Sequence, residues 1–257
     1  MQDPGAMALL FDVDGTLAET EEAHRRAFNQ AFQDFGLPWD WDPARYRALL
    51  LVGGGKERIA AHIATLPEAD ARKLELSSQV AALHAAKVRL YAQALERGEV
   101  TLRPILRRLC ERARQLGLLL GIATTTARPG IEALLRANLG EAGAAMFDVI
   151  VAGDEVPRKK PSPDVYTRAL QTLGVAAHRA VAFEDAAIGV RAAQAAGIFT
   201  IAAPSVWTSS QDLAAADLAL ASFDALASPA VLETARAGAR DHAAAQRAIE
   251  LLAQCAR

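Results

Sequence analysis

The chain has 257 residues, of which 52% are hydrophobic and 23% charged, and its formal net charge is -2. This composition is typical of a soluble globular protein with one large or two modest domains, and without a basic excess we expect no binding to nucleic acid. The two cysteines have no zinc-site spacing and fit a reducing compartment. No apolar run is long enough to span a membrane, and residues 1–6 lack signal-peptide features, so we expect a cytoplasmic protein with a small-molecule partner.

The first predicted strand runs directly into two carboxylates. Apolar residues 9–11 precede Asp12 and Asp14, and Gly15 and Thr16 then break the run, as at the exit of a buried parallel strand. Two neighbouring anions raise the free energy of each other's ionisation unless a cation neutralises them. We therefore expect a metal ion or a shared proton here. A solvated strand end with turn-type hydrogen bonds is the alternative.

Helical patterns fill the stretch that follows, with no convincing strand among them. Apolar residues at helical spacing predict a helix over residues 19–35, which Gly36-Leu37-Pro38 ends. Further helices are expected to open near Pro43, to follow Gly53-Gly54-Gly55, and to run from Ala69 through Tyr91. These patterns predict an all-helical cap domain over residues 19–96, inserted into a core formed by residues 1–18 and 97–257.

Strands and helices alternate in the second part of the chain. This alternation predicts an α/β fold, with a doubly wound (Rossmann-like) parallel sheet that carries helices on both faces. Ligands bind such sheets beyond the carboxyl ends of the strands. The predicted strands cover residues 118–124, 147–151, 180–183 and 199–202, and the helices cover 104–115, 129–138, 163–173, 187–196 and the tail 228–257. Whether that tail packs on the core or in a dimer stays open, and we expect a monomer or a weak dimer.

Four motifs in this order resemble those of the haloacid dehalogenase superfamily of phosphotransferases. They are Asp12-Val13-Asp14-Gly15-Thr16, the strand end at Thr124, Lys160-Pro161 and Glu184-Asp185. The resemblance spans almost the whole chain, and it implies a phosphatase that works through an aspartyl-phosphate.

The resemblance also assigns roles to the motif residues. It implies that Asp12 is the nucleophile and that Asp14 is the general acid, then the base, which keeps a proton near neutrality. Lys160 would neutralise the transferring phosphoryl group, and the Thr124 hydroxyl with the Thr125 N–H would bind its oxygens. A solvated basic loop is the alternative for Lys160, and ordinary strand propensity is the alternative for residues 124–126.

Carboxylates predict the cofactor. Hard oxygen ligands without a nearby Cys or His set favour Mg²⁺, and we expect Asp12, Asp14, Glu184 and Asp185 to hold it. The alternative for Glu184-Asp185 is a cap on the helix that begins near Ala187. Ala186 stands where many relatives carry a hydroxyl or amide group, so one hydrogen bond is expected to be missing.

Residues of the predicted cap are expected to choose the substrate. Residues 18–22, His24 and residues 54–59 resemble the CbbY branch of the superfamily, the xylulose-1,5-bisphosphate phosphatases. Glycines before a helix expose N–H groups to an anion, so we expect a clamp on the distal phosphate. A flexible turn with solvated cations is the alternative; a P-loop is excluded because Glu57 replaces its Ser or Thr. The predicted substrate-binding residues are Glu21, His24, Gly54, Gly55, Lys56, Arg58, His84, Lys87, Thr124, Thr125 and Thr126.

Two of these expectations have specific alternatives. His84 and Lys87 share one helical face, where a histidine is more often a core-edge residue than a ligand. Glu21 and His24 are placed to reach sugar hydroxyls or Asp14.

The leading hypothesis is a Mg²⁺-dependent phosphatase that converts xylulose 1,5-bisphosphate to xylulose 5-phosphate. A β-phosphoglucomutase, or another sugar-phosphate or phosphoglycolate phosphatase, is the near alternative. A receiver-like phospho-acceptor signalling module is the alternative from another class, although such a module needs no helical insertion after its first strand.

Overall fold

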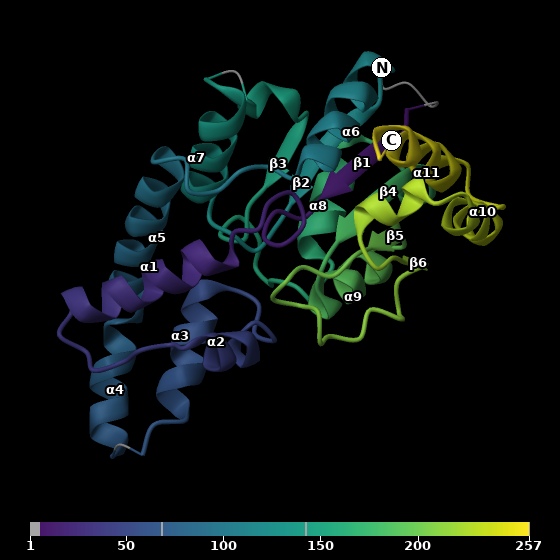
Figure 1. Ribbon diagram of the computed structural model, residues 1–257. Coiled ribbons are helices and arrows are strands. Elements are labelled where there is room, and N and C mark those ends of the chain that lie inside the picture. The colour runs from purple at the N-terminus through teal and green to yellow at the C-terminus, as the bar shows by residue number, and fades with distance from the viewer. Residues whose placement is uncertain (1–5, 68, 142, 257) are drawn as a thin grey trace.

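A computed structural model describes residues 6–67, 69–141 and 143–256 of the chain. Its centre is a parallel sheet of six strands in the order β3-β2-β1-β4-β5-β6, which confirms the predicted α/β fold (Figure 1). The strands are β1 (Ala8–Phe11), β2 (Leu119–Ala123), β3 (Val149–Val151), β4 (Ala180–Glu184), β5 (Phe199–Ala202) and β6 (Leu218–Ala219). The first strand is central because it pairs with both β2 and β4.

Helices cover both faces of this sheet, because side chains of a strand alternate between its two faces. Leu9 and Phe11 belong to an apolar cluster with α6 and α11, whereas Ala8 and Leu10 belong to a second cluster with α8 and α9. The covering helices are α6 (Pro104–Gln115), α7 (Arg128–Leu139), α8 (Asp164–Leu173), α9 (Ala187–Ala195), α10 (Pro229–Gly238) and α11 (Ala243–Cys255), with 3-10 turns η1 (Gly143–Met146), η2 (Ala177–Arg179) and η3 (Phe223–Ala227).

Between β1 and α6, the described residues form five helices, and we call them the helical insertion (Figure 1). They are α1 (Glu21–Asp34), α2 (Pro43–Leu49), α3 (Gly55–Ala64), α4 (Asp70–Ser78) and α5 (Val80–Glu96). Its aromatic-rich apolar cluster includes Phe28, Phe32, Trp41 and Tyr46. The helix α5 also packs against both α1 and α7, so the insertion meets the sheet domain along α7.

The predicted elements differ from the structure at three places. The helix expected from Ala69 through Tyr91 is two helices, with a break at Gln79 where the Ser78 hydroxyl donates to the Glu75 carbonyl 2.6 Å away. The tail is also two helices, because the His242 side chain accepts a hydrogen bond from the main chain and caps α11. The two-residue strand β6 was not predicted, since so short a segment carries no periodicity.

None of the helices in the described ranges combines the length and the apolar character needed to cross a membrane.

Candidate active site

Neighbouring strands bring three carboxylates together at the carboxyl edge of the sheet. Phe11 of β1 pairs in register with Phe183 of β4, so Asp12 and Glu184, the next residues, lie side by side at the ends of the two strands. Asp12, Glu184 and Asp185 each offer an oxygen, and these atoms lie within 4.8 Å of one another. All three side chains are buried. Over the described residues, this is the one group of three acidic, His or Cys side chains close enough to hold a metal ion.

The cation Lys160 lies inside this acidic group. Its Nζ donates to Asp12 Oδ1 over 2.6 Å and to Glu184 Oε1 over 2.7 Å. Tyr166 of α8 donates its hydroxyl to the same Glu184 oxygen. Burial alone would lower the pKa of Lys160, but the two carboxylates raise it above its ordinary value, so the ammonium stays charged.

The donor set fits a divalent cation. Three carboxylates and one ammonium leave two negative charges when all groups are ionised, and the donors are hard oxygens. Without a further cation, burial raises the pKa of Asp12 well above its ordinary value and that of Asp185 to about 8. A divalent ion would stabilise the ionised forms of both groups.

Two glycines make room for these carboxylates. Gly15 has a φ of +84°, and a Cβ there would overlap Asp185 Oδ2. A Cβ on Gly189, in the first turns of α9, would overlap the Glu184 carboxylate. The backbone therefore approaches the acidic group more closely than any other residue type would allow.

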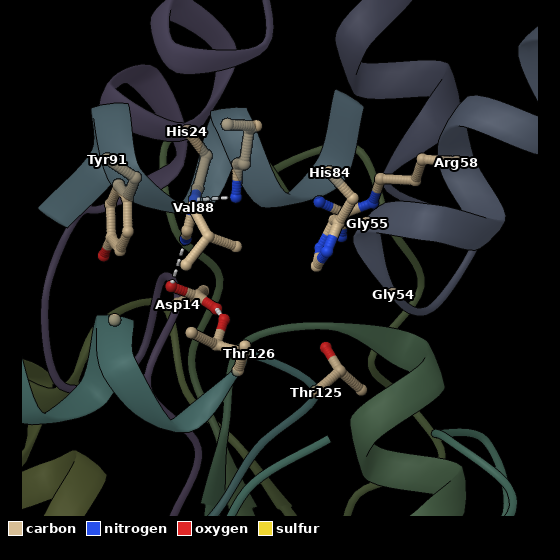
Figure 2. A pocket seen from close by; sticks show the side chains of 13 residues that line it. Asp14, His24, Gly54, Gly55, Arg58, His84, Val88, Tyr91, Thr125 and Thr126 are labelled. Carbon is tan, nitrogen blue, oxygen red and sulfur yellow. Dashed lines mark hydrogen bonds and ion pairs between the residues drawn. The ribbon is translucent and has the colours of Figure 1, made fainter. Parts of the chain in front are cut away.

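Asp14 points away from the acidic group and toward the helical insertion. Its Oδ1 accepts from the Thr20 hydroxyl at 2.6 Å. The same Oδ1 accepts from His24 Nε2 at 2.9 Å, and Oδ2 accepts from the Thr126 hydroxyl (Figure 2). Burial alone would raise the pKa of Asp14, but His24 and these donors lower it. One expectation needs correction, because the Asp14 carboxylate does not join the metal-binding group. The lowered pKa of Asp14 favours its ionised form in this arrangement.

Behind Asp14, His24 links to Lys87 of α5. Lys87 Nζ lies 2.6 Å from His24 Nδ1, and the His24 ring stacks on Tyr91 with centroids 3.7 Å apart. Burial, and then the Lys87 charge, lower the pKa of His24, and burial lowers the pKa of Lys87 to about 7. These contacts assign a neutral His24 that donates from Nε2 and accepts at Nδ1.

Two adjoining pockets meet at Asp14, Arg58 and Thr125, which line both of them. One extends over the acidic group and Lys160. The other lies under the insertion, as Figure 2 shows, and its lining includes Asp14, His24, Gly54, Gly55, Arg58, His84, Lys87, Val88, Tyr91, Thr125 and Thr126. The described residues thus form one cleft with an acidic end and a cationic end.

Arg58 keeps its positive charge at the cationic end of the cleft. Burial would lower the pKa of its guanidinium, but Tyr46 and Glu21 raise it. The Tyr46 hydroxyl donates to Glu21 Oε2 at 2.6 Å and accepts from Arg58 at 3.3 Å. His84 nearby is neutral, because burial and then the charge of Lys87 lower its pKa to about 3.

Two predicted residues lie elsewhere. Lys56 is exposed and does not line either of these pockets, because it extends from the first turn of α3 toward solvent. Thr124 is wholly buried, and its hydroxyl accepts from the Thr126 N–H at 3.2 Å. Thr125 faces both pockets instead. The other predicted residues line one or both pockets.

Sequence reasoning missed the polar residues that support Asp185. Thr208 donates its hydroxyl to Asp185 Oδ2 at 3.0 Å, and a hydrogen bond from Ser205 lowers the pKa of Asp185 against the effect of burial. Both follow β5, so hydroxyl groups from another loop serve Asp185 although Ala186 carries none. The signal available in the sequence was the pair of hydroxyl residues, Ser205 and Thr208, that follows the predicted strand over residues 199–202.

Comparison with known proteins identifies the class of enzyme. The family model for haloacid dehalogenase-like hydrolases matches residues 6–197. The chain therefore belongs to this family, and it is a phosphoric monoester hydrolase.

Particular relatives share most of their length with this chain. It is 45% identical to the protein CbbY of Rhodobacter capsulatus, over 88% of this chain and 97% of the relative. It is 33% identical to a phosphorylated carbohydrates phosphatase of Thermotoga maritima, over 74% of this chain and 82% of the relative. A crystal structure of a CbbY variant from Rhodobacter sphaeroides, in complex with xylulose 1,5-bisphosphate, matches with a TM-score of 0.79 and 44% identity, covering 88% of this chain and 98% of that one.

Proposed function

We propose that this protein is a Mg²⁺-dependent phosphatase of sugar bisphosphates, and that it converts xylulose 1,5-bisphosphate to xylulose 5-phosphate. The observation that carries the proposal is the cleft with two unlike ends, in which Lys160 and three carboxylates adjoin a pocket with Arg58. A bisphosphate needs one end for the reacting phosphate and another for the phosphate that remains. The similarity to a protein crystallised with xylulose 1,5-bisphosphate supports this substrate.

In the proposed mechanism, Asp12 attacks the phosphorus of the 1-phosphate as the bond from phosphorus to the sugar oxygen breaks. Asp12, Glu184 and Asp185 would hold the ion, which supplies positive charge to the phosphoryl oxygens. Lys160 lies 2.6 Å from Asp12 Oδ1 and adds a second positive charge there. Thr125 is placed in the cleft to contact the same phosphate.

Asp14 would give a proton to the leaving sugar oxygen and then take one from the water that attacks the aspartyl-phosphate. Because Asp14 is ionised in this arrangement, it must first acquire that proton. His24 would give that proton from Nε2, 2.9 Å from Asp14, as its Nδ1 takes one from the Lys87 ammonium 2.6 Å away, so that His24 stays neutral and Lys87 becomes an amine. The second step releases inorganic phosphate and regenerates Asp12, so water is the only co-reactant.

We also propose that residues 19–96 form the cap domain of this enzyme. The cationic pocket is lined mainly by residues of α1, α3 and α5, together with residues 125–130 at the start of α7. Movement of the insertion relative to the sheet would admit substrate and then exclude bulk water from the aspartyl-phosphate.

A substrate panel tests the proposal. Phosphate release is measured with xylulose 1,5-bisphosphate, fructose 1-phosphate, β-glucose 1-phosphate, phosphoglycolate and p-nitrophenyl phosphate, each with Mg²⁺ and with a chelator. We expect the highest kcat/KM for xylulose 1,5-bisphosphate, and no release with the chelator or in Asp12→Asn. Isomerisation of β-glucose 1-phosphate without free phosphate would instead identify a mutase, and chelator-resistant turnover would exclude the metal site.

A further inference from the structure

The loop after β5 connects the acidic group with the helical insertion. Ser205 and Thr208 turn inward, where the Thr208 hydroxyl donates to Asp185 Oδ2 at 3.0 Å. Trp207, between them, turns outward and joins the apolar cluster of the insertion. Trp207 is the only member of that cluster, in the described part of the chain, that comes from outside residues 19–96.

The contacts of Trp207 are with α2. Its ring meets Tyr46 edge to face, with centroids 5.5 Å apart and planes at 88°. The guanidinium carbon of Arg47 lies 5.0 Å from the centre of its ring. Both geometries are attractive, since the positive edge of one ring, or a cation, meets the negative face of another. Trp207 is only 9% exposed, whereas its neighbour Val206 is 65% exposed.

Tyr46 carries this contact to the substrate pocket. Its hydroxyl donates to Glu21 Oε2 and accepts from Arg58, so Tyr46 helps to position both side chains, together with the Val52 carbonyl, which accepts from Arg58 Nε at 3.0 Å. Arg58 lines both pockets of the cleft, and Glu21 lines the pocket over the acidic group. The Tyr46 ring therefore links its edge-to-face contact with Trp207 to the charged side chains of Glu21 and Arg58, which its hydroxyl contacts.

We propose that Trp207 is a positioning residue: when the insertion lies against the sheet, Trp207 helps through Tyr46 to hold Arg58 in the cleft, and it holds α2 against the catalytic edge of the sheet. This inference rests on the proposed function, because it assigns Arg58 to the phosphate that is retained. Without Trp207 the insertion keeps its own aromatic core but loses its ring contacts with the loop that supports Asp185, and the hydrogen bond from the Val206 N–H to Glu19 Oε1 at 3.4 Å remains. Substrates that need Arg58 lose affinity, and substrates that reach only the acidic end do not.

A double-mutant cycle tests this proposal, with Val206→Ala as the matched control on the same loop. Steady-state constants are measured with xylulose 1,5-bisphosphate and with p-nitrophenyl phosphate, which has no second phosphate. We expect Trp207→Ala to lower kcat/KM for the bisphosphate at least tenfold, mainly through KM, and to change that for the aryl phosphate less than threefold. Trp207→Phe should recover most of the loss, and Val206→Ala should match the parent enzyme.

The cycle separates positioning from general support. If Trp207 acts through Arg58, the double variant Trp207→Ala/Arg58→Ala should match Arg58→Ala within about twofold. Losses that multiply would overturn the proposal. Equal losses on both substrates with a raised Mg²⁺ requirement would also overturn it, because they would show that Trp207 merely supports Asp185.

A measurement without substrate keeps the inference separate from the proposed function. Amide hydrogen exchange should become faster in α2 of Trp207→Ala and stay unchanged in β1 and β4. If the parent enzyme hydrolyses the aryl phosphate but not the bisphosphate, the proposed substrate is wrong while this exchange result still tests the contact. Unchanged exchange in α2 would refute the contact itself.

Discussion

Replacing Asp185 with asparagine should stabilise the metal-free protein at alkaline pH. Asp185 is 2% exposed, and burial raises its pKa from 3.8 to about 8. Between about pH 4 and pH 8, Asp185 is therefore protonated in the folded state and ionised in the unfolded chain. A carboxyl group of this kind contributes stability below pH 4, and that contribution is lost as the pH rises toward 8. Asparagine has nearly the same shape and never ionises, so the variant lacks this pH-dependent loss.

The size of the effect follows from the shift. Each pKa unit corresponds to about 1.4 kcal/mol, so the fully ionised Asp185 costs roughly 5–6 kcal/mol relative to its protonated form. Between pH 5.5 and 8.0 the difference amounts to about 3 kcal/mol. The free energy of unfolding of the parent protein should therefore fall by about that much more than that of Asp185→Asn over this interval.

Urea unfolding after treatment with a chelator measures this difference, with Asp224→Asn, at an exposed position, as the control. Saturating Mg²⁺ at pH 8 should restore the parent protein and have a much smaller effect on Asp185→Asn, because the variant has lost a ligand. Parallel pH dependences of the parent and the Asp185 variant would refute the reasoning. So would equal stabilisation of both by Mg²⁺.

Two further predictions separate the site from its scaffold. Gly15→Ala should abolish phosphate release, because the added Cβ would overlap Asp185. Gly36 has a similar positive φ but lies in open space, so the control Gly36→Ala should keep its activity and lower the free energy of unfolding by only about 1–2 kcal/mol. Equal activities of the two variants would contradict this reasoning. Leu109→Ala, in the wholly buried face of α6, should lower the free energy of unfolding by about 3–5 kcal/mol and leave kcat unchanged at 20 °C. Chemical denaturation and phosphate assays measure both.

Local patterns were enough to predict most of the fold. The period of apolar residues identified the strands and the helices, and parallel strands end at one edge of a sheet. The meeting of Asp12 with Glu184 and Asp185 could thus be expected from the sequence, once β1 and β4 were recognised as strands. The break in the helix at Gln79 and the strand β6 were missed, because each depends on only two or three residues.

Tertiary structure alone decided which polar groups meet across the cleft. The sequence did not distinguish the exposed Lys56 from Arg58 in the pocket. It offered Asp14 as one of two partners for His24, a contact that the structure has, but it did not show that Asp14 also accepts from Thr20 and Thr126. Nor did it place Trp207 against α2. The physical reason is that periodicity reports which face of an element is buried, whereas hydrogen bonds and ring contacts depend on how elements far apart in the chain pack together.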